Sequence, residues 1–180
     1  IISRILFELN CQVFRLVGDY MVRIAVFGDI HYPREEHLFY RLLRTLESES
    51  LDLVAICGDI INYGSLAYLN KFMRKVYKVT KAPIIGVMGN HDFWLPENLR
   101  RQNLDSLSLI PRYKRIFGLY GGHLLWDEPY FLEDIAFVGV PGWYDFSFAP
   151  QSLGYTREDY LKGYFFGFQW NDMVFTKFPY

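Results

Sequence analysis

The chain has 180 residues, a length that suits one domain. Apolar residues make up 51% of it, enough for a substantial core, and the formal net charge of −1 offers no basic surplus for a nucleic-acid footprint. No apolar run approaches the roughly 18 residues of a membrane span, and charged residues interrupt the apolar N-terminus, unlike a secretory signal. We therefore expect a cytoplasmic protein without membrane contact or a strong affinity for nucleic acid.

The two cysteines, Cys11 and Cys57, belong to no Cys-x-x-Cys pattern. Cys57 lies in an apolar run, which predicts a buried free thiol. Without a disulfide framework, the pattern favours a reducing compartment.

Residues 1–20 precede the first clear strand pattern, so we separate them from a domain at 21–180. Met21 stands directly before that strand and is a candidate start of the native protein. Two interpretations of residues 1–20 stay open: an extension outside the domain, or an amphipathic helix packed on it.

Three short runs rich in Val and Ile, mostly without polar alternation, have the character of strands buried on both faces of a parallel sheet. They lie at residues 22–27, 53–57 and 84–88. The segments between them, 35–50 and 65–81, carry apolar residues at helical spacing, and Ser65 is suited to cap the second. Strands and helices therefore alternate in units of about 30 residues, as in βαβ folds.

The pattern is looser after residue 92. We expect a helix at 103–110, ended by Pro111, and strands at 130–132 and 135–140 joined by a turn. The tail from Gly142 is crowded with aromatic residues and is not assigned.

Each of the three buried strands ends in glycine followed by a polar residue: Gly28-Asp29, Gly58-Asp59 and Gly89-Asn90. In open parallel sheets, ligands bind beyond the carboxyl ends of the strands, and adjacent strands lie about 4.8 Å apart. These side chains can therefore converge on metal ions. His31 can add a nitrogen ligand, and Asp59 is the natural bridge because its two oxygens can serve two cations.

The three motifs are Asp29-Ile30-His31, Gly58-Asp59-Ile60-Ile61-Asn62 and Gly89-Asn90-His91-Asp92. Together they resemble the first three motifs of the calcineurin-like metallophosphoesterases, from residue 22 to about residue 145. The resemblance implies an α/β fold, a layered β-sandwich flanked by helices in α-β-β-α order.

The resemblance also implies the roles of the site residues. Asp29 and His31 would hold one metal ion, Asp59 would bridge, and Asn90 would hold the other, while His91 would contact the phosphate. The implied cofactors are two divalent ions, Mn, Fe or Zn, and the implied reaction is hydrolysis of a phosphoester substrate, monoester or diester, by metal-activated hydroxide.

Two further residues, Asn62 and Asp92, are expected to support the site. Asn62 stands where many family members have an aspartate that pairs with the catalytic histidine; an amide can orient His91 but cannot stabilise its charged form as a carboxylate would. Asp92 is expected either to anchor the loop behind His91 or to cap a helix start near Trp94.

The family's later Gly-His-x-His motif is absent. The chain has four histidines, His31, His37, His91 and His123, and His123 comes too early in the sequence for that motif. We interpret His37 and His123 as structural or solvated. The chain therefore looks truncated, and the alternative to an active phosphoesterase is a catalytically incomplete scaffold or a fragment of an active enzyme. A sheet face left exposed would favour self-association.

Overall fold

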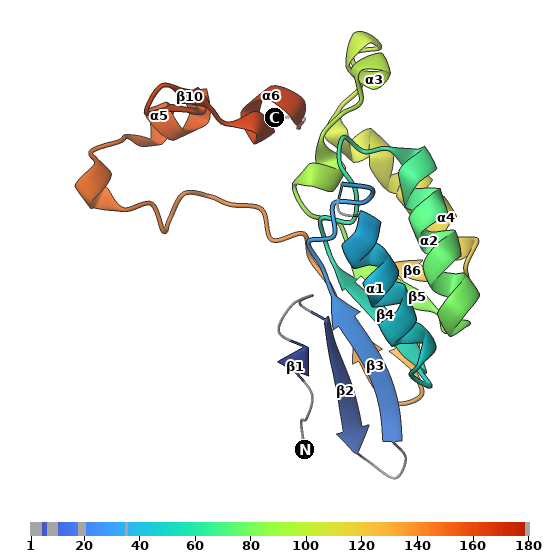
Figure 1. Cartoon of the computed structure of the whole chain (residues 1–180). Coiled ribbons are helices and arrows are strands. Elements are labelled where there is room, and N and C mark those ends of the chain that lie inside the picture. The colour runs from blue at the N-terminus through green and yellow to red at the C-terminus, as the bar shows by residue number, and fades with distance from the viewer. Residues whose placement is uncertain (1–4, 7–10, 18–20, 35, 179–180) are drawn as a thin grey trace.

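The computed structural model describes residues 5–6, 11–17, 21–34 and 36–178. Its main feature is a six-stranded sheet with the order β1-β2-β3-β4-β5-β6 (Figure 1). The strands are β1 (Ile5–Leu6), β2 (Cys11–Val17), β3 (Met21–Phe27), β4 (Leu53–Cys57), β5 (Ile84–Val87) and β6 (His123–Leu124). Strands β3 to β6 run parallel, and β1 and β2 extend the sheet with antiparallel pairing. The three predicted parallel strands are confirmed.

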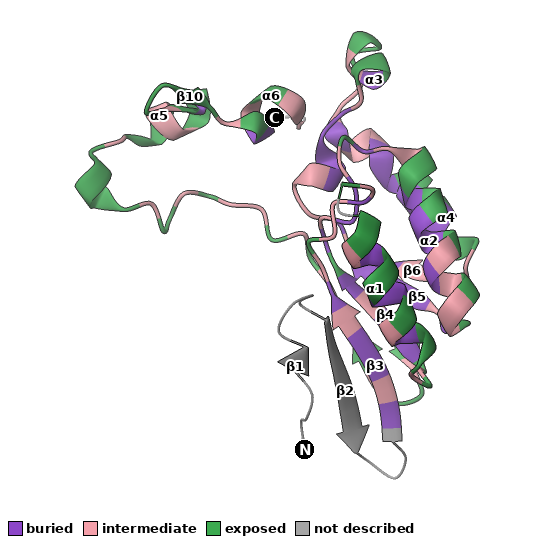
Figure 2. Cartoon of the chain, viewed as in Figure 1, coloured by how far each residue is buried: buried purple, intermediate pink, exposed green. Residues whose placement is uncertain are grey.

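Three helices cover one face of this sheet: α1 (Glu36–Glu47), α2 (Leu66–Thr80) and α4 (Ile110–Gly118). Their buried stripes face inward (Figure 2). In α2 this stripe is Leu69, Phe72, Met73 and Val76. Ser65 caps α2 by accepting a hydrogen bond from the Tyr68 amide, as predicted.

A short antiparallel hairpin covers part of the opposite face. It consists of β7 (Tyr130–Leu132) and β8 (Ile135–Phe137). Its inner side chains pack in one cluster with the sheet residues Val22, Ile24, Leu53 and Ile85 and with Leu125, which follows β6. Helices on one side and a hairpin on the other establish the α/β class, and the hairpin lies where the expected second sheet of the sandwich would stand.

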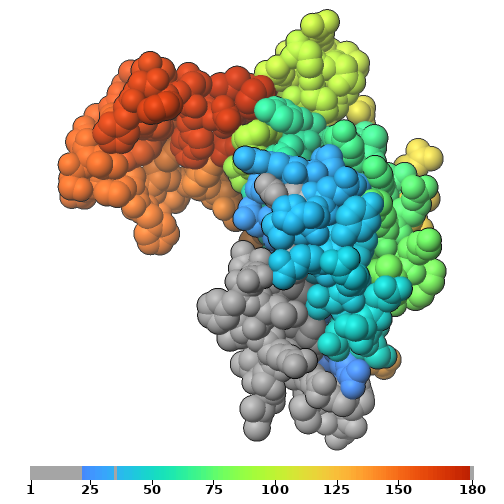
Figure 3. Space-filling view, in the orientation of Figure 1, coloured from blue at the N-terminus to red at the C-terminus, as the bar shows by residue number. Residues whose placement is uncertain are grey.

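The chain beyond β8 leaves the body and returns to it (Figures 1 and 3). Its short elements are η3 (Gln151–Leu153), α5 (Arg157–Lys162), β9 (Tyr164–Phe165), β10 (Phe168–Gln169) and α6 (Asn171–Phe175). The return is fixed by backbone bonds: the Leu95 amide donates to the Phe175 carbonyl at 2.8 Å and the Ser106 amide to the Lys177 carbonyl at 2.7 Å. Helix α6 therefore lies close to η1 (His91–Phe93) and α3 (Glu97–Arg101).

The predicted end of a helix at Pro111 is wrong. Pro111 stands in the first turn of α4, after a 3-10 turn η2 (Ser106–Leu109). Proline fits this position because its missing N–H would have no partner inside the helix and its φ is already helical.

Two other expectations also fail. The helical interpretation of residues 1–20 is wrong at 11–17, which pair as a strand with β3, while residues 1–4, 7–10 and 18–20 lie outside the described residues. Cys57 is exposed, because the last residue of β4 turns toward the open edge of the sheet where ligands would bind.

Among the described helices, none has the length and apolar character to cross a membrane.

Candidate metal centre

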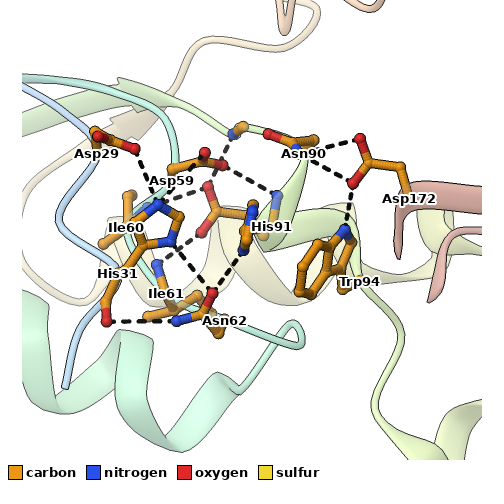
Figure 4. Close-up of polar contacts among 12 residues, drawn as sticks. Asp29, His31, Asp59, Ile60, Ile61, Asn62, Asn90, His91, Trp94 and Asp172 are labelled. Carbon is orange, nitrogen blue, oxygen red and sulfur yellow. Dashed lines mark hydrogen bonds and ion pairs between the residues drawn. The ribbon is translucent and has the colours of Figure 1, made fainter. Parts of the chain in front are cut away.

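The polar residues of the three motifs gather at the carboxyl edge of the sheet (Figure 4). Asp29 follows β3 and Asp59 follows β4, each after one glycine, and Asn90 follows β5 after Met88 and Gly89. Asp29 and Asp59 both have positive φ, 60° and 50°, so the chain turns sharply as each strand ends. Parallel pairing in register brings these turns side by side.

Glycine is required where the second and third motifs meet. A Cβ at Gly89 would lie 2.2 Å from Asp59 Oδ1, and a Cβ at Gly58, whose φ is +85°, would lie 2.8 Å from the Gly89 nitrogen. The carboxylate of Asp59 occupies the space that a side chain at 89 would fill. The glycines thus allow the two loops to approach closely.

The first loop is paired with the second beyond the ends of the strands. The amides of Ile30 and His31 both donate to the Asp59 carbonyl at 2.9 Å, and the Tyr32 amide donates to the Ile60 carbonyl at 2.8 Å. This pairing holds the His31 side chain beside Asp59.

Asp92 joins the second and third loops from beneath. Its fully buried carboxylate accepts hydrogen bonds from the amides of Ile61 at 2.9 Å, Gly89 at 2.8 Å and Ile60 at 3.3 Å. Burial raises the pKa of Asp92 to about 7, and the charge of Asp59 acts in the same direction, while the three amides oppose the shift. Asp92 therefore anchors the loops that follow β4 and β5. Its side chain accepts hydrogen bonds from backbone amides in these loops and does not cap η1.

Three potential ligand atoms lie within 4.8 Å of one another, one each from His31, Asp59 and His91. His31 Nε2 is 2.9 Å from Asp29 Oδ1 and 3.9 Å from Asp59 Oδ2. Asp29 is 70% exposed and Asp59 19%, so the cluster is open on the Asp29 side. Because carboxylates only accept hydrogen bonds, these contacts need either a proton or a cation on the imidazole nitrogen. The donor set therefore fits a divalent metal ion.

Asn62 sets the orientation of both imidazoles. Its Oδ1 is 2.7 Å from His91 Nδ1 and 3.2 Å from His31 Nδ1. An amide oxygen only accepts, so both histidines donate through Nδ1 and the Nε2 lone pairs are left for other partners. Its Nδ2 donates to the His31 carbonyl at 3.4 Å, which fixes which end of the amide faces the rings.

His91 is packed between two rings and tied to Asp59. Its imidazole stacks on Trp94 at 3.7 Å between centroids and lies edge-on to His31 at 4.4 Å. The His91 amide donates to Asp59 Oδ1 at 3.0 Å. Burial lowers the pKa of His91; the negative charge of Asp59 opposes this shift, and the neighbouring His31 adds to it.

The fourth predicted ligand, Asn90, is hydrogen-bonded to Asp172, which the sequence did not identify as a site residue. Its Nδ2 donates to both oxygens of Asp172, at 2.9 and 3.1 Å, and Asp172 comes from α6 (Figure 4). Asp29, Asp59, Asn90 and Asp172 all line one cavity of about 490 Å³, with Trp143, Tyr144 and Trp170 on its wall. Asp172 belongs to no recognisable motif, so only the return of the C-terminal segment reveals it.

The other two histidines do not join this cluster. His37 lies in α1 and is exposed, and His123 lies in β6, where Nε2 contacts the Glu128 carbonyl at 3.0 Å. Both positions agree with a role outside the metal site.

The fold and the site define a class of α/β protein that gathers metal-binding side chains at the carboxyl ends of a parallel sheet. The chain belongs to the calcineurin-like phosphoesterase family, whose model matches residues 22–167. A search of curated proteins finds no match to the chain. Membership supports metal-dependent phosphoester hydrolysis as the general activity of this fold.

The raised pKa of Asp92 predicts a specific dependence of stability on pH. The folded protein holds this proton more tightly than the unfolded chain, whose Asp pKa is about 3.9. The contribution of Asp92 to the free energy of unfolding therefore falls as pH rises from about 4 to about 7, and is constant above. Between about pH 5 and pH 8, metal-free wild type should lose roughly 2–3 kcal/mol relative to Asp92→Asn in urea unfolding. A difference between the two proteins that does not vary with pH would contradict this.

Asn62→Asp should raise the pKa of His91. The new carboxylate would lie against the imidazole Nδ1 in place of an amide, and a nearby negative charge favours imidazolium by roughly 1 unit or more. NMR titration of the metal-free protein measures this directly. Asn98→Asp, an equal charge change at an exposed position of α3, is the control and should leave His91 unchanged. Equal shifts in both variants would show that Asn62 has no special link to His91.

Proposed function

We propose that this chain hydrolyses a phosphoester with two divalent ions held by Asp29, His31, Asp59 and Asn90, with His91 beside the reacting phosphate. The observation that carries the proposal is the convergence of His31, Asp59 and His91 within 4.8 Å at the strand ends of a calcineurin-like phosphoesterase fold. Phosphomonoesters and phosphodiesters are both within this proposal.

The side chains support it by their preset orientation. When bound, two divalent ions supply a hydroxide from water and neutralise phosphoryl oxygens. Asp59 Oδ1 is held by the His91 amide, which leaves Oδ2 facing His31. Asp59 can therefore offer one oxygen to each of two ions, and the mixed oxygen and nitrogen donors suit Mn²⁺, Fe or Zn²⁺.

His91 is suited to act on the phosphate through one atom. Its Nδ1 is committed to Asn62, so Nε2 is the atom that can exchange a proton with a phosphoryl or leaving-group oxygen. Stacking on Trp94 holds the ring plane and keeps water from one face. Because Asn62 carries no charge, His91 is expected to bind its proton weakly and to stabilise developing charge when it does.

A scaffold without catalysis is the second candidate. The observation that favours it is the lack of any histidine after His123, which leaves each ion with fewer protein donors than the family pattern supplies. A scaffold of this kind would also be expected to self-associate through exposed apolar residues. Phe131 on the hairpin that covers the sheet, and Val138 and Val140 just beyond it, are such residues. A cytoplasmic location remains part of the proposal under both candidates.

Two substitutions should separate metal binding from catalysis. We expect Asp59→Asn to abolish the binding of at least one Mn²⁺ ion in calorimetry, because the bridging carboxylate is lost. His91→Ala should keep Mn²⁺ binding while lowering turnover of bis-para-nitrophenyl phosphate or para-nitrophenyl phosphate by about 10²–10⁴-fold. Titration and assay on the same samples are the measurements.

His123→Ala is the matched control, since it removes an imidazole outside the cluster and should change neither quantity. Loss of Mn²⁺ from His91→Ala would instead make His91 a metal ligand. Tight Mn²⁺ binding by wild type without turnover of either ester would favour the scaffold.

A further inference from the structure

We propose that Asp172 is a positioning residue of the metal centre, which turns the amide oxygen of Asn90 toward the ion. This inference rests on the proposed function, because it takes Asn90 as a metal ligand. Asp172 lies outside the residues 22–167 that match the family, so neither the match nor the three motifs assign it a role.

The argument begins with the two ends of the Asn90 side chain. Only the amide oxygen can bind a cation, and the NH₂ group repels one. An unsupported asparagine can present either end. It becomes a dependable ligand only when a neighbour selects the nitrogen side.

Asp172 supplies that selection. A carboxylate only accepts hydrogen bonds, so the group that faces it must be the donor. Asn90 Nδ2 lies 2.9 Å from one of its oxygens and 3.1 Å from the other. The amide oxygen is consequently directed away from Asp172, and both residues line the cavity that contains Asp29 and Asp59.

The carboxylate of Asp172 is itself held in place. The Trp94 indole donates to its Oδ1 at 2.6 Å, and the residue is only 2% exposed (Figure 4). The segment that follows Asp172 is held by Ser106. The Ser106 amide donates to the Lys177 carbonyl, and the Ser106 hydroxyl accepts from the Lys177 amide at 3.0 Å. A buried carboxyl group that accepts from the Trp94 indole costs much to displace, so its direction is well determined.

The consequence is a link between the C-terminal segment and the metal centre. Asn90 and Asp172 are 82 positions apart, and the docking of α6 is what brings them together. Besides orienting Asn90, Asp172 adds negative charge to the cavity wall, which favours a dication.

The test is Mn²⁺ binding by the full chain, measured by calorimetry and by the EPR signal of free Mn²⁺. Asp172→Ala should weaken the binding of one ion by about 10–100-fold, the usual effect of losing a partner that orients a ligand. Asp172→Leu is the second variant, in case the first does not fold. It fills the same buried space but offers no acceptor to Asn90 Nδ2, so it should weaken binding too.

A double-mutant cycle shows whether Asp172 acts through Asn90. In an Asn90→Ala background, Asp172→Ala should cause little further loss of Mn²⁺ affinity, because the group it orients is gone. Fully multiplicative losses would overturn the inference, since they would mean independent effects.

Ser106→Ala is the matched structural control. It loosens the same segment without touching the carboxylate, and should lower thermal stability while leaving Mn²⁺ affinity near that of wild type. An equal loss of affinity in Ser106→Ala and Asp172→Ala would overturn the inference in favour of segment docking alone. Wild-type affinity in a folded Asp172→Leu protein would overturn it while leaving the proposed function intact, whereas wild type that binds no Mn²⁺ would overturn both.

Discussion

The buried carboxylate of Asp92 is the constraint on which the site depends. It accepts hydrogen bonds from three backbone amides in the loops after β4 and β5, and so it links the turn that carries Asn90 and His91 to the loop that carries Asp59. Burial makes its charge costly and raises its pKa, and the three hydrogen bonds offset only part of that cost. The absence of a side chain at Gly89 is the steric counterpart, because it leaves room for the Asp59 carboxylate.

Hydrogen-bond partners determine the orientation of three side chains at this site. Asn62 accepts from Nδ1 of both His31 and His91, which leaves the Nε2 atom of each ring for other partners. Asp172 accepts from Asn90 Nδ2, so the amide oxygen of Asn90 faces away from Asp172. His31, His91 and Asn90 are thus each oriented by a hydrogen-bond partner. Such an arrangement lowers the reorganisation needed when a cation or a phosphate arrives. Residues from four separate segments of the chain, 29–31, 59–62, 90–92 and 172, contribute to this one site.

The sequence predicted the parts of this protein that local pattern controls. Buried strands that end in Gly-Asp or Gly-Asn repeat three times, and parallel pairing must bring such ends together, so the neighbourhood of Asp59 was foreseeable. Pro111 was misjudged because proline suits a first helical turn as well as a helix end. Asp172 could not be foreseen: its partner is 82 residues away, and no spacing or motif encodes the return of α6. Contacts that depend on the path of an irregular segment leave no local signal.

The central claim is that Asp59 joins two metal ions at the strand ends. Anomalous diffraction from crystals grown with Mn²⁺ tests it most directly. The account predicts two manganese peaks about 3.5–4 Å apart, both in contact with Asp59, one beside His31 and Asp29 and the other beside Asn90. A single peak away from Asp59, or none at this edge of the sheet under saturating Mn²⁺, would contradict it.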